Sequence, residues 1–202
     1  MYKIIKWILD RLLALIAGIV FFPFFVLIGL LIKITSKGPI LFKQKRVGKN
    51  KKIFYIWKFR TMRIDAPHDV ATHLFESPDK YITRIGKFLR KTSIDELPQI
   101  YNILFGKMSI VGPRPALWNQ YDLIEERDKY NANSVYPGLT GWAQVNGRDT
   151  LDIKEKAKLD GEYVQKFGFI MDVKCFFKTI SHVLKREDIV EGNISSQNKD
   201  EE

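Results

Sequence analysis

The sequence predicts a helix-rich α+β fold, and three observations support that prediction. Residues 12–32 carry no charge and, at about 1.5 Å per helical residue, reach the roughly 30 Å of a bilayer's hydrocarbon core. Residues 39–62 alternate apolar with basic side chains around Gly48, which is typical of a small β-hairpin. Later segments repeat apolar residues at helical spacing, which predicts amphipathic helices at the membrane surface.

Composition limits the classes of partner without selecting one. The chain has 202 residues, enough for one domain, and its 33 Lys and Arg exceed its 23 Asp and Glu to give a net charge of +10. Such an excess favours partners that carry phosphate, whether nucleic acid, anionic lipid or a nucleotide substrate. The single cysteine, Cys175, lies among aromatic residues, so we expect a small core side chain in a reducing compartment.

The apolar N-terminal segment is expected to stay attached and to enter a membrane. A signal peptide would be shorter and would end in a small-residue cleavage site, whereas Lys33 and Lys37 follow this segment. Pro23 lies near its middle, where proline removes a backbone donor. Basic residues flank both ends, and the positive-inside rule places such ends, and the folded domain, in the cytoplasm. We therefore predict a re-entrant membrane helix hairpin broken at Pro23, with a kinked spanning helix as the alternative.

The remaining elements follow from apolar periodicity and from the residues that end helices. Residues 110–115 and 136–148 are rich in proline and glycine and are expected to be irregular loops. Helices are expected at residues 84–91, 97–104, 118–130, 154–166 and 171–185.

Several familiar nucleotide and metal motifs are missing from the sequence. The chain has no G-x-G-x-x-G fingerprint, no glycine-rich loop that ends in Gly-Lys-Ser/Thr and no Asp-x-Asp pair. One cysteine and three scattered histidines, His68, His73 and His182, do not make the ligand spacing of a zinc site. What remains is an acidic pair, Asp95 and Glu96, that follows a basic stretch.

The acidic pair has two interpretations. Ser93-x-x-Glu96 fits a capping box, and acidic residues commonly occupy the first turn of a helix. Alternatively, a helix N-terminus keeps Asp95 ionised, which makes it available as a nucleophile or a metal ligand. Arginines from separate segments could then neutralise incoming phosphates, because one guanidinium can hold two phosphate oxygens. These arginines are Arg60, Arg90, Arg114 and Arg148.

Two loops could contribute to the same site. Pro113 and Pro115 bracket Arg114, so the backbone is stiff where that charge is presented; the alternative is an exposed turn with a solvated arginine. Residues 138–148 contain three glycines, a tryptophan and Gln144, and could either wrap a polar ligand or form a packed surface loop.

Four segments together resemble a known family. Residues 58–62 (KFRTM), 93–99 (SIDELPQ), 111–115 (VGPRP) and 137–148 (PGLTGWAQVNGR) occur in the order seen in monotopic phosphoglycosyl transferases, the bacterial sugar transferases. The chain is similar to the minimal form of that family from its N-terminus to about residue 190. One departure is Phe22-Pro23, because the family often has Ser-Pro at the break in its membrane helix.

The resemblance implies a ping-pong transfer of a sugar-1-phosphate. Asp95 would attack the β-phosphate of a UDP-sugar and release UMP, and polyprenyl phosphate would then attack the aspartyl phosphosugar. Glu96 would manage protons or support the metal. Mg²⁺ is implied as the cofactor, with Asp95 as a ligand, since a divalent ion offsets the repulsion between a carboxylate and phosphates. The residues expected to contact substrate are Arg60, Arg90, Pro113, Arg114, Gln144 and Arg148.

Sequence and resemblance together imply three regions and a location. Residues 1–36 would form the membrane-embedded helix, 37–190 the cytoplasmic catalytic domain and 191–202 a disordered tail, in the bacterial inner membrane. The implied partners are a UDP-sugar, polyprenyl phosphate and membrane lipid, without nucleic acid, in the first membrane step of glycoconjugate assembly. Two alternatives stay open: a non-catalytic, membrane-anchored basic module that binds anionic lipid or nucleic acid, and a glycosyltransferase that leaves UDP.

Overall fold

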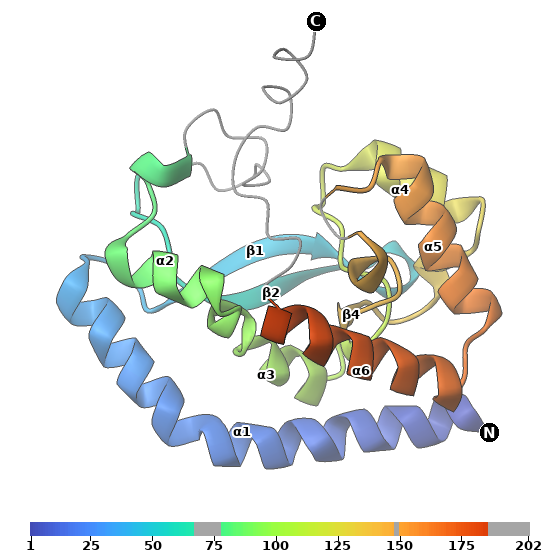
Figure 1. Ribbon diagram of the computed structural model, residues 1–202, viewed down its shortest axis with the longest axis horizontal. Coiled ribbons are helices and arrows are strands. Elements are labelled where there is room, and N and C mark those ends of the chain that lie inside the picture. The colour runs from blue at the N-terminus through green and yellow to red at the C-terminus, as the bar shows by residue number, and fades with distance from the viewer. Residues whose placement is uncertain (67–77, 148–149, 186–202) are drawn as a thin grey trace, which may run out of the picture.

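The computed structural model describes residues 1–66, 78–147 and 150–185. One long helix, α1 (Tyr2–Thr35), runs along one edge of the molecule, and the other helices and strands are packed on one side of it (Figure 1). The predicted helix-rich α+β class is confirmed. The predicted tail, residues 191–202, lies outside the described residues.

Helix α1 is continuous through Pro23, so the structure does not contain the predicted break into a two-helix hairpin. Proline removes only one backbone donor, and the ribbon curves around the domain rather than folding back on itself (Figure 1). The buried residues of α1, from Lys6 to Ile32, recur on one face of the helix. Packing of that face against the domain on both sides of the proline accounts for the continuity.

The opposite face of α1 is apolar and exposed. Ile19, Val20 and Phe22 have 67%, 65% and 59% of their surface exposed. By length and composition α1 could cross a membrane, and within the described ranges it is the one helix that could. Exposing such a face to water costs about 25 cal/mol per Å² of apolar surface. The outer face of α1 therefore favours an apolar medium outside the domain.

The predicted β-hairpin is confirmed. Strands β1 (Leu41–Val47) and β2 (Ile53–Phe59) are antiparallel, with Leu41 opposite Phe59. The turn between them places Asn50 at φ 54°, a left-handed conformation that asparagine tolerates better than most residues do.

The helices predicted after the hairpin are all present, and their ends lie within a few residues of the predicted ones. Two begin at side-chain N-caps, because the Thr83 hydroxyl accepts from the Gly86 amide at 3.0 Å and the Asp152 carboxylate accepts from the Glu155 amide at 2.7 Å. The helices are α2 (Arg84–Lys91), α3 (Gln99–Leu104), α4 (Tyr121–Asp128), α5 (Ile153–Gln165) and α6 (Phe169–Lys185).

A second pair of strands lies where the sequence analysis expects only irregular loops. Strand β3 (Ser109–Val111) pairs in parallel with β4 (Gly138–Thr140), so this part of the loop prediction is wrong. The two backbones approach so closely that a Cβ added at Gly138 would lie 2.1 Å from the Gly112 amide nitrogen. Only glycine fits at position 138, and strands of three residues are too short to show an alternating apolar pattern.

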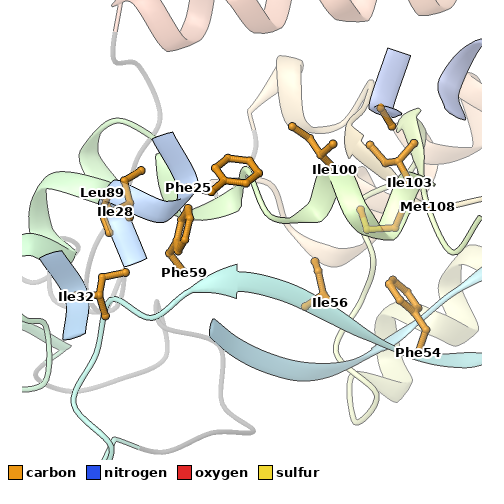
Figure 2. Close-up of a cluster of buried hydrophobic side chains, with 11 residues drawn as sticks. Phe25, Ile28, Ile32, Phe54, Ile56, Phe59, Leu89, Ile100, Ile103 and Met108 are labelled. Atoms are coloured by element: carbon orange, nitrogen blue, oxygen red, sulfur yellow. The ribbon is translucent and has the colours of Figure 1, made fainter. Parts of the chain in front are cut away.

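The largest core lies between α1, β2 and α3 (Figure 2). Phe25 of α1 meets Phe59 of β2 edge to face, with ring centroids 5.6 Å apart. Further along β2, Ile56 points toward α3, whose Ile100 and Ile103 belong to the same cluster (Figure 2). The buried members of this cluster are Ala14, Phe25, Ile28, Ile32, Phe54, Ile56, Phe59, Leu89, Ile100, Ile103 and Met108.

A buried polar network ties the N-terminal end of α1 to the domain. The Lys6 ammonium lies 2.7 Å from Asp172 Oδ2 in α6 and 3.4 Å from Asp10 Oδ2. The Tyr2 hydroxyl donates to Asp172 at 2.5 Å, and the Ser109 hydroxyl donates to Asp10 at 2.5 Å. Because these charges are buried and paired with the domain, separating the first turns of α1 from it would be costly.

The other end of α1 is held by Arg60. Its guanidinium donates to the carbonyl oxygens of Ser36 and Lys37 at 2.9 and 2.8 Å, and to the Ser36 hydroxyl at 2.6 Å. A cation is favourable at a helix C-terminus, where the last carbonyls are unpaired. Both ends of α1 therefore contact the same folded domain.

Candidate active site

The predicted acidic pair lies on a single tight turn, η4 (Ile94–Glu96), between α2 and α3. Ser93 enters this turn in the left-handed region at φ 55°, which costs on the order of 1 kcal/mol for a residue other than glycine. The Ser93 side chain makes no capping hydrogen bond in the described chain, and Glu96 points elsewhere. The capping-box interpretation of Ser93 and Glu96 is therefore wrong.

Glu96 is held between two cations. The Lys58 ammonium donates to Glu96 Oε1 at 2.7 Å. Arg114 forms a two-pronged contact, in which Nη2 donates to Oε1 at 2.6 Å and Nη1 donates to Oε2 at 3.2 Å. Both carboxylate oxygens are thus engaged, and the pairs are mostly buried, so the geometry of Glu96 is fixed before any ligand binds.

Asp95, in contrast, is buried and has no hydrogen-bond donor among the described side chains. Only 8% of its surface is exposed, and no side chain among residues 1–66, 78–147 and 150–182 donates a hydrogen bond to its carboxylate. Burial raises the pKa of Asp95 to about 6; the Lys58 ammonium opposes the rise, and the Glu96 charge adds to it. The expectation that a helix N-terminus keeps the pKa of Asp95 low is therefore wrong, because burial has the largest effect on that pKa and raises it. With a pKa near 6 the group is still mostly a carboxylate at neutral pH.

Lys58 is a site residue that the sequence analysis did not select. Burial lowers the pKa of its ammonium, and Glu96 opposes that shift. A signal for Lys58 is present in the strand pattern: Phe54, Ile56 and Lys58 are spaced by two, so they share one face of β2. A lysine in phase with core residues is expected to be buried against a partner, which here is Glu96.

The Arg114 loop is held from three directions through three successive carbonyls. The Gly138 amide donates to the carbonyl of Pro113 at 2.9 Å. Arg127 in α4 donates to the carbonyl of Arg114 at 3.0 Å. The third donor is Arg46 of β1, which donates to the carbonyl of Pro115. The stiff loop predicted from the two prolines is thus also clamped by its neighbours, which fixes the direction of the Arg114 side chain.

Two arginines, the buried Arg127 and the partly buried Arg46, hold the other two carbonyls, and the sequence analysis selected neither. Arg46 of β1 donates to the Pro115 carbonyl at 3.0 Å and to Gln44 Oε1 at 2.6 Å. Arg127 forms a buried ion pair with Asp160 of α5, with Nη2 2.6 Å from Oδ2. Arg46 lies directly across from Phe54 in the hairpin, so it too shares the core face. Their role is to position Arg114.

The other residues predicted to contact substrate are placed differently. Arg60 holds the end of α1, as described above. The Arg90 guanidinium donates through Nε to the Thr61 hydroxyl at 2.9 Å, and its charge lowers the pKa of Asp95, so it lies near the acidic turn. Gln144 donates to the Leu139 carbonyl at 3.1 Å, and its buried Oε1 accepts no hydrogen bond from the described residues. Arg148 lies outside the described residues.

The side chains at the acidic turn fit a Mg²⁺ ion that shares its ligands with a substrate. Within the described ranges there is no group of three or more carboxylate, histidine or cysteine side chains that could hold a metal ion alone. Mg²⁺, however, is commonly bound by one or two carboxylates together with substrate phosphates and water. The Asp95 carboxylate accepts no hydrogen bond from a described side chain and can therefore bind a metal ion. Glu96, in contrast, accepts hydrogen bonds from Lys58 and Arg114.

Comparison with known proteins points to the same family as the four sequence motifs. The Bacterial sugar transferase family matches residues 1–186. UDP-glucose:undecaprenyl-phosphate glucose-1-phosphate transferase from Xanthomonas campestris pv. campestris is 36% identical over 190 residues, which cover 91% of this chain and 39% of that protein. UDP-N-acetylgalactosamine-undecaprenyl-phosphate N-acetylgalactosaminephosphotransferase from Aeromonas hydrophila is 39% identical over 191 residues, covering 91% and 44%.

A shorter relative aligns over almost its whole length. Exopolysaccharide production protein PSS from Rhizobium leguminosarum bv. phaseoli is 40% identical over 193 residues, covering 91% of this chain and 96% of that protein. The chain spans about two fifths of the length of the two longer relatives. The family match covers α1 and every residue of the acidic site. The chain therefore belongs to the bacterial sugar transferase family.

Proposed function

We propose that this chain is a phosphoglycosyl transferase that moves a sugar-1-phosphate from a UDP-sugar to undecaprenyl phosphate, with UMP as the leaving product. The observation that carries the proposal is the buried Asp95 carboxylate, which receives no hydrogen bond from a described side chain but lies in the field of Lys58, Arg90 and Arg114. The names of the longer relatives, which act on UDP-sugars and undecaprenyl phosphate, supply the substrate classes.

In the first half of the reaction, an Asp95 oxygen attacks the β-phosphorus of the UDP-sugar. A carboxylate–phosphorus bond forms, the bond from that phosphorus to the bridging oxygen breaks, and UMP leaves with the electron pair. Arg114 and Lys58 offset the negative charge that gathers around the reacting phosphate. The Arg114 loop is rigid before the substrate arrives, so little ordering is left for the transition state.

In the second half, a phosphate oxygen of undecaprenyl phosphate attacks the same phosphorus. The carboxylate–phosphorus bond breaks, and Asp95 is regenerated with undecaprenyl diphosphosugar as the product. Glu96 is assigned to hold Lys58 and Arg114 in place, because both of its oxygens are engaged by them. When Mg²⁺ is bound through Asp95 it supplies charge neutralisation for the diphosphate.

The contacts of α1 support membrane insertion from one side. At about 1.5 Å per residue its 34 residues measure roughly 50 Å, well beyond the roughly 30 Å of a hydrocarbon core. Its first turns are paired with Asp172, and Ser36, its C-terminal cap residue, accepts hydrogen bonds from Arg60; both partners belong to the one folded domain. We infer that the curved helix is re-entrant, that its exposed apolar face lies in the inner membrane, and that the domain faces the cytoplasm.

Cysteine labelling tests this geometry. Lys3 and Lys37 are exposed near the two ends of α1, and Cys175 is fully buried, so single Lys3→Cys and Lys37→Cys variants give clean signals. A membrane-impermeant maleimide should label neither variant in intact spheroplasts and both in lysed ones. Labelling of Lys3→Cys from outside, with Lys37→Cys protected, would establish a spanning helix instead.

The pH dependence of the reaction should report Asp95. Because burial raises its pKa to about 6, kcat/KM for the UDP-sugar should fall as the pH drops through about 6, where the nucleophile is protonated. Lys58 lowers the pKa of Asp95, so Lys58→Gln should move the acid limb to higher pH. A profile that stays flat down to pH 4.5, or a limb that moves to lower pH in the variant, would contradict the assignment.

The nucleotide product tests the proposed reaction class. Detergent-solubilised protein with Mg²⁺, a panel of UDP-sugars and undecaprenyl phosphate should release UMP with one or a few donors. UDP as the product would instead establish a glycosyltransferase. No nucleotide release with any donor would favour a non-catalytic membrane-anchored module that binds anionic lipid or nucleic acid.

A further inference from the structure

A cavity of about 280 Å³ lies beside the first turns of α1, away from the acidic turn. Its walls come from α1, from β3, from the segment around Val135 and from Phe167 before α6. None of the residues that surround Asp95 lines it. The reaction proposed above therefore leaves this cavity without a role.

The lining of the cavity is divided by chemistry. Ile4, Val135 and Phe167 supply apolar walls. Lys3 and Lys49 bring two ammonium groups, and the Lys49 ammonium lies 4.7 Å from the centre of the Tyr136 ring. An apolar interior combined with cationic groups fits an amphiphile that has a negatively charged head.

The position of the cavity selects the kind of amphiphile. Neighbouring surfaces are apolar and exposed: Ile4 and Ile8 on α1 are 67% and 53% exposed, and Phe169 and Ile170 at the start of α6 are 65% and 82% exposed. Figure 1 shows these two helix ends side by side. The cavity lining also includes Trp7, and tryptophan, tyrosine and lysine are the residues that gather at the headgroup level of a bilayer.

Charge favours an anionic head. Lys6 is paired with both Asp172 and Asp10, so these three side chains together carry one negative charge, and the ammonium groups of Lys3 and Lys49 leave a net charge of +1 at the cavity. We propose that the cavity binds one anionic phospholipid of the surrounding bilayer, with its phosphate at Lys3 and Lys49 and part of an acyl chain against Val135 and Phe167. This proposal rests on the membrane placement of α1, but on no step of the proposed reaction.

Native mass spectrometry with dioleoyl phosphatidylglycerol tests the proposal on the full chain in detergent. Wild type should retain one lipid, and Lys3→Gln/Lys49→Gln should weaken its binding about ten- to thirtyfold, because each lysine near a membrane surface contributes on the order of a factor of five. The matched control is Lys52→Gln/Lys107→Gln, which removes the same charge from exposed positions outside the cavity and should change binding less than threefold.

Three further arms make each outcome decisive. Val135→Trp, which fills the apolar part, should also abolish retention, and its thermal unfolding shows whether it is folded; if it is not, the lysine pair decides. Glycerol 3-phosphate should not compete, since equal competition would establish a site for a free anion. Undecaprenyl phosphate should compete no better than phosphatidylglycerol, since stronger competition would make the cavity an acceptor site. Equal lipid retention by wild type and both lysine variants would overturn the proposal.

Discussion

Asp95→Asn should release UMP from a UDP-sugar at least about a thousandfold more slowly than wild type, while the protein remains folded. Removing a nucleophile abolishes the covalent route, and the amide that replaces it cannot attack phosphorus at a useful rate. The measurement is UMP release in detergent with Mg²⁺ and undecaprenyl phosphate. Asp65→Asn is the matched control, because Asp65 is an exposed carboxylate paired with Arg63 at the surface.

The same substitution should raise stability near neutral pH. The folded pKa of Asp95, about 6, lies above its ordinary 3.8, so the folded state favours the protonated form and loses stability as pH rises from 3.8 through 6. The loss is roughly 2 to 3 kcal/mol at pH 7, and neutral Asn avoids it. Thermal unfolding should show the gain at pH 7 and little difference at pH 4.

An Asp95→Asn protein that turns over at the wild-type rate would contradict the assignment of Asp95 as the nucleophile.

Arg127→Met should be the most destabilising single change near the site. It leaves Asp160, which is 1% exposed, without its partner, and loss of one member of a buried ion pair costs about 3 to 5 kcal/mol. For a chain of this length we expect the midpoint of thermal unfolding to fall by roughly 10 °C. Lys129→Met is the control, since its ion pair with Glu126 lies at the surface and surface pairs contribute little.

The double variant Arg127→Met/Asp160→Leu separates stability from function. Replacing both charges by apolar groups should recover most of the lost stability. It cannot restore the hydrogen bond from Arg127 to the Arg114 carbonyl, so UMP release should remain about ten- to a hundredfold low. Recovery of both stability and activity in the double variant would show that the clamp on the Arg114 loop has no positioning role.

Local pattern is sufficient for most of the secondary structure and fails where distant packing decides. The alternation in residues 39–62 and the periodicity in residues 84–91 correspond to β1, β2 and α2. Pro23 has the local character of a helix break, but its helix is supported on both sides by the domain. Strands β3 and β4 are three residues each and pair across the chain through glycine, which leaves no apolar repeat to detect.

The site could be predicted in part for similar reasons. Asp95, Glu96 and Arg114 stand out as charged residues in stiff or acidic contexts, and the structure brings them together. Arg46 and Arg127, which hold the loop that carries Arg114, are single charges inside ordinary elements, and only their spacing relative to core residues marks them. The raised pKa of Asp95 depends on burial by segments far apart in the sequence, which no local pattern encodes.

Trapping the covalent intermediate tests the central claim most directly. Wild-type protein is incubated with UDP-sugar and Mg²⁺ without acceptor, quenched in acid, digested and analysed by mass spectrometry. The peptide that contains Asp95 should gain the mass of one phosphosugar, and addition of undecaprenyl phosphate before quenching should remove it. If undecaprenyl diphosphosugar forms at the full rate while that peptide stays unmodified, or if another residue carries the phosphosugar, the assignment of Asp95 as nucleophile is wrong.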